Sequence, residues 1–196
     1  TAVDFLEELD VPAYKIASFE NIDLPLIERV AITGKPVIIS TGMADESQID
    51  EAVCTARASG CRELALLHCV SGYPTPPEAS NLRTLSDMSK RFGVLVGLSD
   101  HTLTTATAVA AVALGAAIIE KHVTMSREDG GPDAAFSLEP HELKQLVEDC
   151  RIVHEALGVV TYEQATCEKS STVFRRSIYV VKDMSEGEEF TSQNLR

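Results

Sequence analysis

The sequence predicts an α/β fold made of repeated strand and helix units around a parallel sheet. Short aliphatic runs recur along the chain, and a helical pattern follows each of them. The runs are almost continuously apolar, which is typical of strands buried on both faces. Polar residues follow each run directly, and no G-x-G-x-x-G does. These features favour a closed (β/α)8 TIM barrel over an open doubly wound sheet, because barrel sites form where the strands end.

Each element of this prediction can be located along the chain. The five expected strands cover residues 13–18, 36–41, 64–71, 94–100 and 117–124. The helical patterns each close with glycine, which helix C-termini favour, and cover residues 23–34, 45–60, 81–93, 104–115 and 139–158. The stretch "VDFLEEL" predicts a helix before the first strand.

Five units are too few to close a barrel of eight strands and about 250 residues. We therefore expect residues 1–158 to be the C-terminal five units of a TIM barrel, with three further units before Thr1. Residues 159–173 read as a linker. Residues 174–196 predict one strand, a charged turn at Gly187 and a polar tail, as the beginning of a second small domain.

Composition excludes several classes of function. A net charge of −13 argues against a nucleic-acid groove, which needs clustered Lys and Arg. No run reaches the roughly 18 consecutive apolar residues of a membrane helix. The 5 cysteines form no CxxC pair and lie partly within apolar runs. We expect reduced, buried thiols and a cytoplasmic location.

Two histidines stand at the ends of neighbouring predicted strands. In "GLSDHT", Ser99 and His101 share one side of the strand and Asp100 takes the other; in "IIEKHVT", Glu120 shares a side with His122, opposite Lys121. Adjacent strands run about 4.8 Å apart, a spacing that suits two imidazoles on one metal ion. The alternative is two core histidines bonded to backbone carbonyls. Two ligands leave coordination positions open, which favours a catalytic over a structural metal.

Further polar residues follow the other strands. A lysine and several hydroxyls converging there would form a cradle for a phosphate or carboxylate. Taken singly, a serine at a strand end is more often a turn residue or a helix cap, as Asp45 is expected to be. His68 lies between leucines and a cysteine, so we expect a core histidine and not a ligand. The residues in or just after the C-terminal parts of the first three strands are Lys15, Ser18, Glu20, Ser40, Thr41, Ser71 and Tyr73, and Gly130, Gly131 and Asp133 lie in the loop after the last strand.

Seven motifs follow one another along the chain: "YKIASFE", "KPVIISTGMA", "LLHCVSGYPTPPE", "NLRTL", "VGLSDHT", "ALGAAIIEKHVT" and "GGPDAAFSLEP". In this order they resemble the nonulosonic (sialic) acid synthase family, and the resemblance covers residues 12–196. Residues 175–196 resemble the start of that family's C-terminal antifreeze-like (SAF) domain. Two motifs, "KIASFE" and "GGPDAAFSLEP", resemble the members that make pseudaminic acid more than those that make N-acetylneuraminate.

The resemblance implies that phosphoenolpyruvate condenses with an open-chain N-acetylated amino sugar and that phosphate is released. For pseudaminic acid the sugar is 2,4-diacetamido-2,4,6-trideoxy-L-altrose. His101 and His122 would bind a divalent metal, Mn²⁺ first, with Mg²⁺ and Co²⁺ as alternatives. Phosphoenolpyruvate would contact Lys15, Ser18, Ser40, Ser71 and Ser99. The sugar would face Glu20, Tyr73 and Asp133, and the catalytic set would be Glu20, Lys15, His101 and His122.

The resemblance also implies a domain-swapped homodimer whose SAF domains cover the partner's barrel mouth. A chain without the first three strands would then be inactive alone. Two alternatives stay open: the same chemistry on the N-acetylneuraminate or legionaminic acid precursor, and a sugar-binding barrel without catalysis. The second alternative predicts loss of the histidine pair or the lysine, and the sequence keeps His101, His122 and Lys15.

Overall fold

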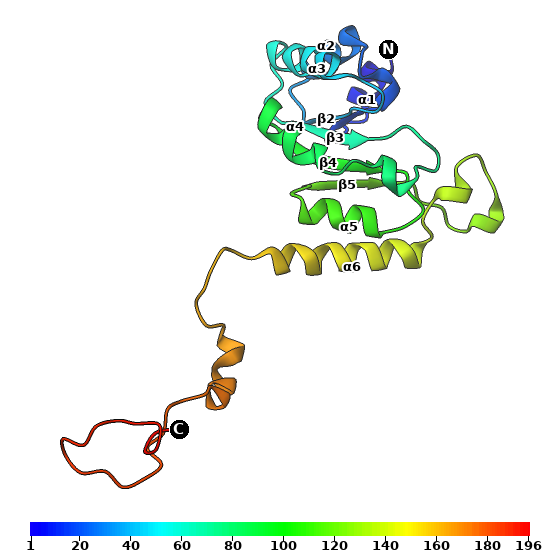
Figure 1. Ribbon diagram of the computed structural model, residues 1–196. Coiled ribbons are helices and arrows are strands. Elements are labelled where there is room, and N and C mark those ends of the chain that lie inside the picture. Colours follow the sequence, from blue (N-terminus) through cyan, green and yellow to red (C-terminus); the bar gives the residue numbers. More distant parts are fainter. The chain divides into compact units, whose positions relative to one another are not determined.

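One sheet of five parallel strands organises residues 1–158 of the computed structural model, which describes residues 1–196 (Figure 1). The strands lie in chain order: β1 (Tyr14–Ile16), β2 (Val37–Ser40), β3 (Leu64–Cys69), β4 (Leu95–Asp100) and β5 (Ile118–Lys121). The helices are α1 (Ala2–Glu8), α2 (Leu24–Ala31), α3 (Glu46–Ala58), α4 (Thr84–Phe92), α5 (Ala106–Ala113) and α6 (Pro140–Leu157). The predicted alternation of strands and helices is confirmed.

The sheet is curled. In a flat sheet the edge strands β1 and β5 would lie roughly 19 Å apart. The Nζ atom of Lys15 on β1 nevertheless lies 3.6 Å from Oε2 of Glu120 on β5. The five strands therefore form half of a barrel, with these two side chains on its concave face.

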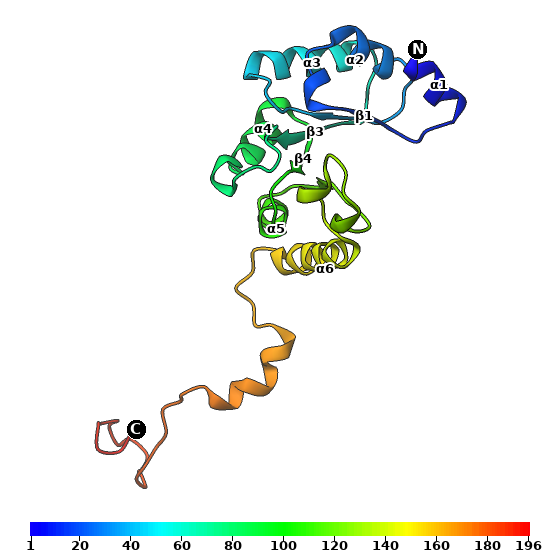
Figure 2. The same cartoon turned by 90° about the vertical axis from the view of Figure 1, so that its right-hand side faces the viewer.

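The helices cover the convex face of the sheet. Figures 1 and 2 show α2 to α5 following one another along this side. Alternate side chains of each strand point toward the helices and make the main apolar core. Ile16, Ile39 and Leu66 from the strands pack with residues such as Ile27 and Leu85 from the helices, all at most 2% exposed.

Local chemistry explains where the helices begin and end. The Asp45 carboxylate accepts a hydrogen bond from the Gln48 amide at 2.9 Å, so the predicted cap of α3 is confirmed. Helix α4 ends at Gly93, whose φ of 60° is the left-handed conformation that glycine adopts without strain. No helix in the structure is both long enough and apolar enough to cross a membrane.

Three expectations need correction. Residues 174–196 form no strand, only a bridge between Val180 and Leu195, because no neighbouring strand offers a ladder of partners. Strand β5 ends at Lys121 rather than at residue 124, since the chain then turns to bridge Val123 with Leu138. The thiols are all free, but those of Cys54 and Cys167 are exposed because they lie on the outer side of α3 and in the second unit, residues 159–196.

Candidate active site

The carboxyl ends of β3, β4 and β5 place three polar side chains level with one another. Strand register pairs Cys69 with Ser99 and Ser99 with Glu120. The Ser99 hydroxyl donates to Oε1 of Glu120 at 2.7 Å, while Oε2 of the same carboxylate faces the Lys15 ammonium at 3.6 Å. A charged, hydrogen-bonded group thus spans the concave face from β5 to β1.

Glu120 and Cys69 are missing from the set of site residues predicted from the sequence. Glu120 could have been found from its position two residues before His122, on the same side of the strand. Cys69 is 2% exposed, and burial raises the pKa of its thiol against the opposing effect of the nearby Ser99, Ser71 and Ser18 hydroxyls. The thiol is therefore a neutral neighbour of the serines at neutral pH.

Two of the predicted serines meet at a tight turn of the backbone. The hydroxyl oxygens of Ser18 and Ser71 lie 3.1 Å apart, although they follow different strands, β1 and β3. Gly42, in the loop after β2, packs directly against them. A Cβ atom at Gly42 would lie 2.3 Å from Cβ of Ser18 and 3.0 Å from Oγ of Ser71, and φ is 51°. Only glycine lets these three loops converge.

The two predicted metal ligands are side by side. The ring centroids of His101 and His122 are 5.3 Å apart. Nδ1 of His101 lies 2.9 Å from the Val70 carbonyl oxygen; a carbonyl only accepts, so Nδ1 carries the proton and Nε2 keeps a free lone pair. Nδ1 of His122 lies 3.5 Å from Oδ2 of Asp133. Metal-binding histidines typically have such a carbonyl or carboxylate behind the ring.

An aromatic wall flanks the two histidines. The ring centroids of Tyr73 and His101 are 4.3 Å apart. The centroid of the Phe136 ring lies 5.1 Å from that of His122 and 5.4 Å from that of Tyr73. Burial raises the pKa of the Tyr73 hydroxyl, so this group is a protonated donor at neutral pH. Phe136 was not predicted, because a phenylalanine in a loop carries no signal of its own in a single sequence.

The side chains of two predicted residues, Glu20 and Ser40, form no hydrogen bond with the other predicted residues. The Glu20 carboxylate is exposed and accepts from the Ala17 amide at 3.1 Å, within the 3-10 turn Ser18–Glu20. Ser40 is 1% exposed, and its hydroxyl has no hydrogen-bond partner. Asn21 lies beside it, donating to the Ser40 carbonyl oxygen at 3.3 Å.

His68 belongs to the core rather than to the site. Its Nε2 lies 2.7 Å from the Ser80 carbonyl oxygen, and the side chain is buried on the helix-facing side of β3. Burial lowers the pKa of this imidazole. The structural interpretation of His68 is confirmed.

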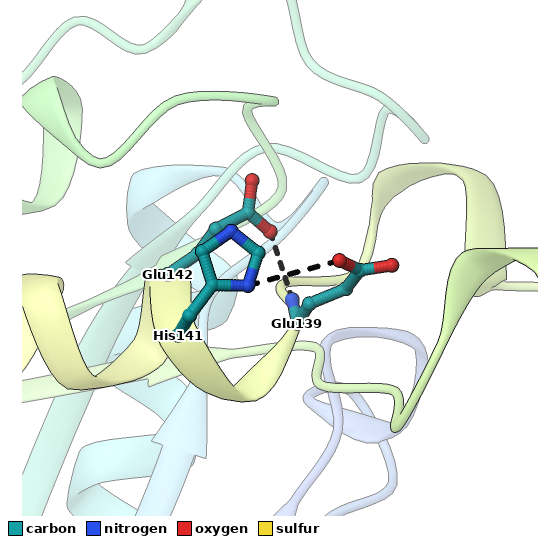
Figure 3. A group of neighbouring side chains, drawn as sticks. All are labelled: Glu139, His141 and Glu142. Atoms are coloured by element: carbon teal, nitrogen blue, oxygen red, sulfur yellow. Dashed lines mark hydrogen bonds and ion pairs between the residues drawn. The ribbon is translucent and has the colours of Figure 1, made fainter.

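A second group of potential ligands, Glu139, His141 and Glu142, lies at the start of α6 (Figure 3). Its carboxylates already have partners. Glu142 accepts from the Glu139 amide at 2.8 Å and pairs with Arg127, whose amide in turn bonds to Glu139 at 3.0 Å. His141 is 76% exposed. This group caps the helix and fastens the loop after β5 to it.

Comparison with known proteins agrees with this arrangement. A model of the NeuB family matches residues 1–162. The chain belongs to this family. The resemblance to nonulosonic acid synthases is thereby confirmed.

This NeuB-family chain is similar to proteins from several organisms. It is 44% identical, over 98% of its length and 58% of the relative's, to MJ1065 of Methanocaldococcus jannaschii. It is 40% identical to a pseudaminic acid synthase of Helicobacter pylori, covering 100% of this chain and 58% of the relative. It is 39% identical to an N,N'-diacetyllegionaminic acid synthase of Campylobacter jejuni, over 99% of this chain and 59% of the relative. The chain therefore spans less than two thirds of these relatives.

A solved structure extends the similarity to the fold. The N-acetylneuraminic acid (sialic acid) synthetase of Leptospira borgpetersenii, in complex with citrate, superposes with a TM-score of 0.80 at 35% identity. The match covers 88% of this chain and 60% of the other.

Proposed function

We propose that this protein is a nonulosonic acid synthase that joins phosphoenolpyruvate to an N-acetylated amino sugar and releases phosphate. The observation that carries the proposal is the convergence of Lys15, several serine hydroxyls and the His101–His122 pair at one end of the curled sheet. An ammonium and hydroxyls suit an anionic substrate, and a histidine pair suits a divalent cation.

Phosphoenolpyruvate would lie over the serines and Lys15. The Ser18 and Ser71 hydroxyls, 3.1 Å apart, can donate together to one anionic group. The buried Ser40 hydroxyl lacks a partner, which suits a site completed by a substrate oxygen. Lys15 and Ser99 are joined through Glu120, so both can face the same substrate.

The residues present fit the proposed metal. Because the proton of His101 is on Nδ1, its Nε2 has the lone pair that can bind the metal. The Asp133 carboxylate lies behind His122, where carboxylates often orient a metal-binding histidine. With two imidazoles as protein ligands, the remaining positions are open to water or substrate oxygens. A bound Mn²⁺, or Mg²⁺ or Co²⁺ in its place, would polarise the aldehyde oxygen of the sugar as a Lewis acid.

The remaining chemistry falls to residues of this chain. C3 of phosphoenolpyruvate attacks the sugar aldehyde carbon, which leaves positive charge at C2. The Glu120 carboxylate, fixed by Ser99, is placed on the concave face to stabilise that charge. Water then adds to C2 and gives one proton to the alkoxide formed from the aldehyde oxygen. The bond between C2 and the phosphate oxygen breaks, the second water proton leaves with phosphate, and C2 becomes the keto carbon. Tyr73, Asp133 and Glu20 would contact the sugar.

The sugar that we propose is 2,4-diacetamido-2,4,6-trideoxy-L-altrose, which gives pseudaminic acid. The support is the motif resemblance in "KIASFE" and "GGPDAAFSLEP". Overall identity does not separate this choice from a legionaminic acid synthase. A SAF domain beginning at residue 174, a domain-swapped homodimer and a cytoplasmic location stay predictions.

The test supplies the purified full-length protein with phosphoenolpyruvate, Mn²⁺ and, in turn, each of the three sugar precursors, and measures phosphate. We expect release only with the altrose derivative, and loss of at least about 100-fold in rate for His101→Ala and Lys15→Ala. Lys144→Ala, whose side chain is 78% exposed on α6, is the matched control for Lys15→Ala and should keep its rate. Activity only with N-acetylmannosamine would overturn the choice of sugar. A protein that binds no divalent ion, with His101→Ala unchanged in sugar binding, would favour the non-catalytic alternative.

A further inference from the structure

We propose that Asp100 and Lys121 are positioning residues that hold His101 and His122 at the separation a shared metal ion requires. The inference rests on the proposed function, since it assumes that the two histidines bind a metal. It concerns the opposite face of the same two strands, where neither side chain can reach the substrates.

The pair forms an internal link between β4 and β5. Strand register places Asp100 directly beside Lys121, and Oδ2 of the carboxylate lies 2.8 Å from the ammonium. The side chains are only 1% and 3% exposed. Both point away from the concave face, because the side chains of neighbouring residues alternate along a strand.

The ammonium uses all three of its donors, and each oxygen of the carboxylate accepts one hydrogen bond. The Lys121 ammonium also donates to the carbonyl oxygens of Thr102, at 2.5 Å, and Thr104, at 3.1 Å. The other oxygen of Asp100 accepts from the Thr102 amide at 2.9 Å. The ammonium thus donates its three hydrogen bonds to one carboxylate and two carbonyl oxygens.

This link fixes the backbone on both sides of His101. His101 lies between Asp100 and Thr102, and both of these neighbours are bonded to Lys121. His122 follows Lys121 directly. Strand β5 ends at Lys121, and beyond it the His122 carbonyl oxygen accepts from the Leu138 amide at 2.8 Å rather than pairing with β4. The two segments that carry the histidines are therefore joined last at Asp100 and Lys121, by their backbone pairing and by the ion pair.

A buried ion pair is weak evidence for stability, because removing two charges from water offsets much of their attraction. The position of the pair gives it a geometric role. The pair crosses between the strands one residue before each histidine, and His101 and His122 then stand with ring centroids 5.3 Å apart. Residues behind the ligands of a metal commonly change its affinity by about 10- to 100-fold.

The test compares Mn²⁺ binding, followed by the electron paramagnetic resonance signal of free Mn²⁺, in the wild-type chain and two variants. Lys121→Arg keeps the charge but alters the donor geometry. Asp100→Asn with Lys121→Gln removes both charges and leaves no lone buried ion. Leu85→Ala, a truncation in the core between the sheet and α4, is the control for lost stability. Circular dichroism without metal selects temperatures at which each protein is folded.

We expect Mn²⁺ affinity to fall by about 10-fold or more in the two pair variants and to stay within about twofold in Leu85→Ala. If one pair variant does not fold, the other decides the outcome. Wild-type affinity in a folded pair variant would overturn the positioning role and leave the proposed function intact. A wild-type chain that binds no Mn²⁺ would instead overturn the metal assignment, and the inference with it.

Discussion

The imidazole of His68 has one hydrogen bond, from Nε2 to the Ser80 carbonyl oxygen at 2.7 Å. Burial lowers the pKa of this group below its ordinary value of 6.5. Below that pH the His68 imidazole is protonated in the unfolded chain, whereas burial disfavours its protonation in the folded chain. The contribution of His68 to stability is therefore complete above pH 6.5 and is lost as the pH falls.

A substitution isolates this effect from other titrating groups. In His68→Gln, the amide can still donate to Ser80 but does not titrate. We expect the free energy of unfolding of wild type to fall more steeply than that of the variant between pH 7.5 and pH 5. Urea unfolding of both proteins at several pH values measures the difference. Parallel curves would contradict the assigned burial effect.

Among the elements, the pairing of β4 with β5 depends on a glycine. Gly97 faces the concave side of β4, and a Cβ atom there would lie 2.4 Å from the Ile118 carbonyl oxygen and 2.6 Å from Cδ2 of Leu67. The Leu67 side chain could shift, but the contact with the Ile118 carbonyl oxygen cannot be relieved without movement of a strand. The close approach also determines where β5, and hence His122, lies relative to His101.

We expect Gly97→Ala to lower the free energy of unfolding by about 1–3 kcal/mol, since an added methyl group overpacks the interface between the strands. Leu95→Ala is the matched control: it lies on the same strand and the same face, but its side chain is 64% exposed. Urea unfolding should show a smaller loss for this control. A Gly97→Ala chain as stable as wild type would mean that β4 and β5 separate easily.

At the scale of the whole molecule, the five thiols differ in their access to solvent. Cys54 and Cys167 are exposed, Cys61 and Cys69 are buried, and Cys150 is intermediate. Burial raises the pKa of the Cys61, Cys69 and Cys150 thiols, which lowers the fraction of reactive thiolate.

We expect Ellman's reagent to modify Cys54 and Cys167 rapidly and Cys61 and Cys69 only after urea is added. Absorbance gives the number of thiols modified, and peptide mass spectrometry identifies them. Cys54→Ser should remove one rapid equivalent and leave the protection of Cys69 unchanged. Modification of Cys69 as fast as Cys167 would show that the concave face is not packed as described.

The sequence by itself determined the order of the elements, the parallel sheet and the family. Alternation along a strand also predicted that Ser99 and His101 point to one side and Asp100 to the other, because this depends only on local geometry. The Asp100–Lys121 pair on the convex side agrees with that prediction. The pairing of Glu120 with Lys15 did not follow, since no local pattern gives the distance between β1 and β5.

Tertiary structure alone decided how these residues meet. The curl of the sheet brings Lys15 to Glu120, and the tight turn at Gly42 brings Ser18 to Ser71. Phe136 reaches His122 through the path of a loop. The strand expected near Val180 failed to form because strand propensity needs a neighbouring strand. Periodicity determines which face a side chain takes, whereas curvature and packing between distant segments determine which side chains are in contact.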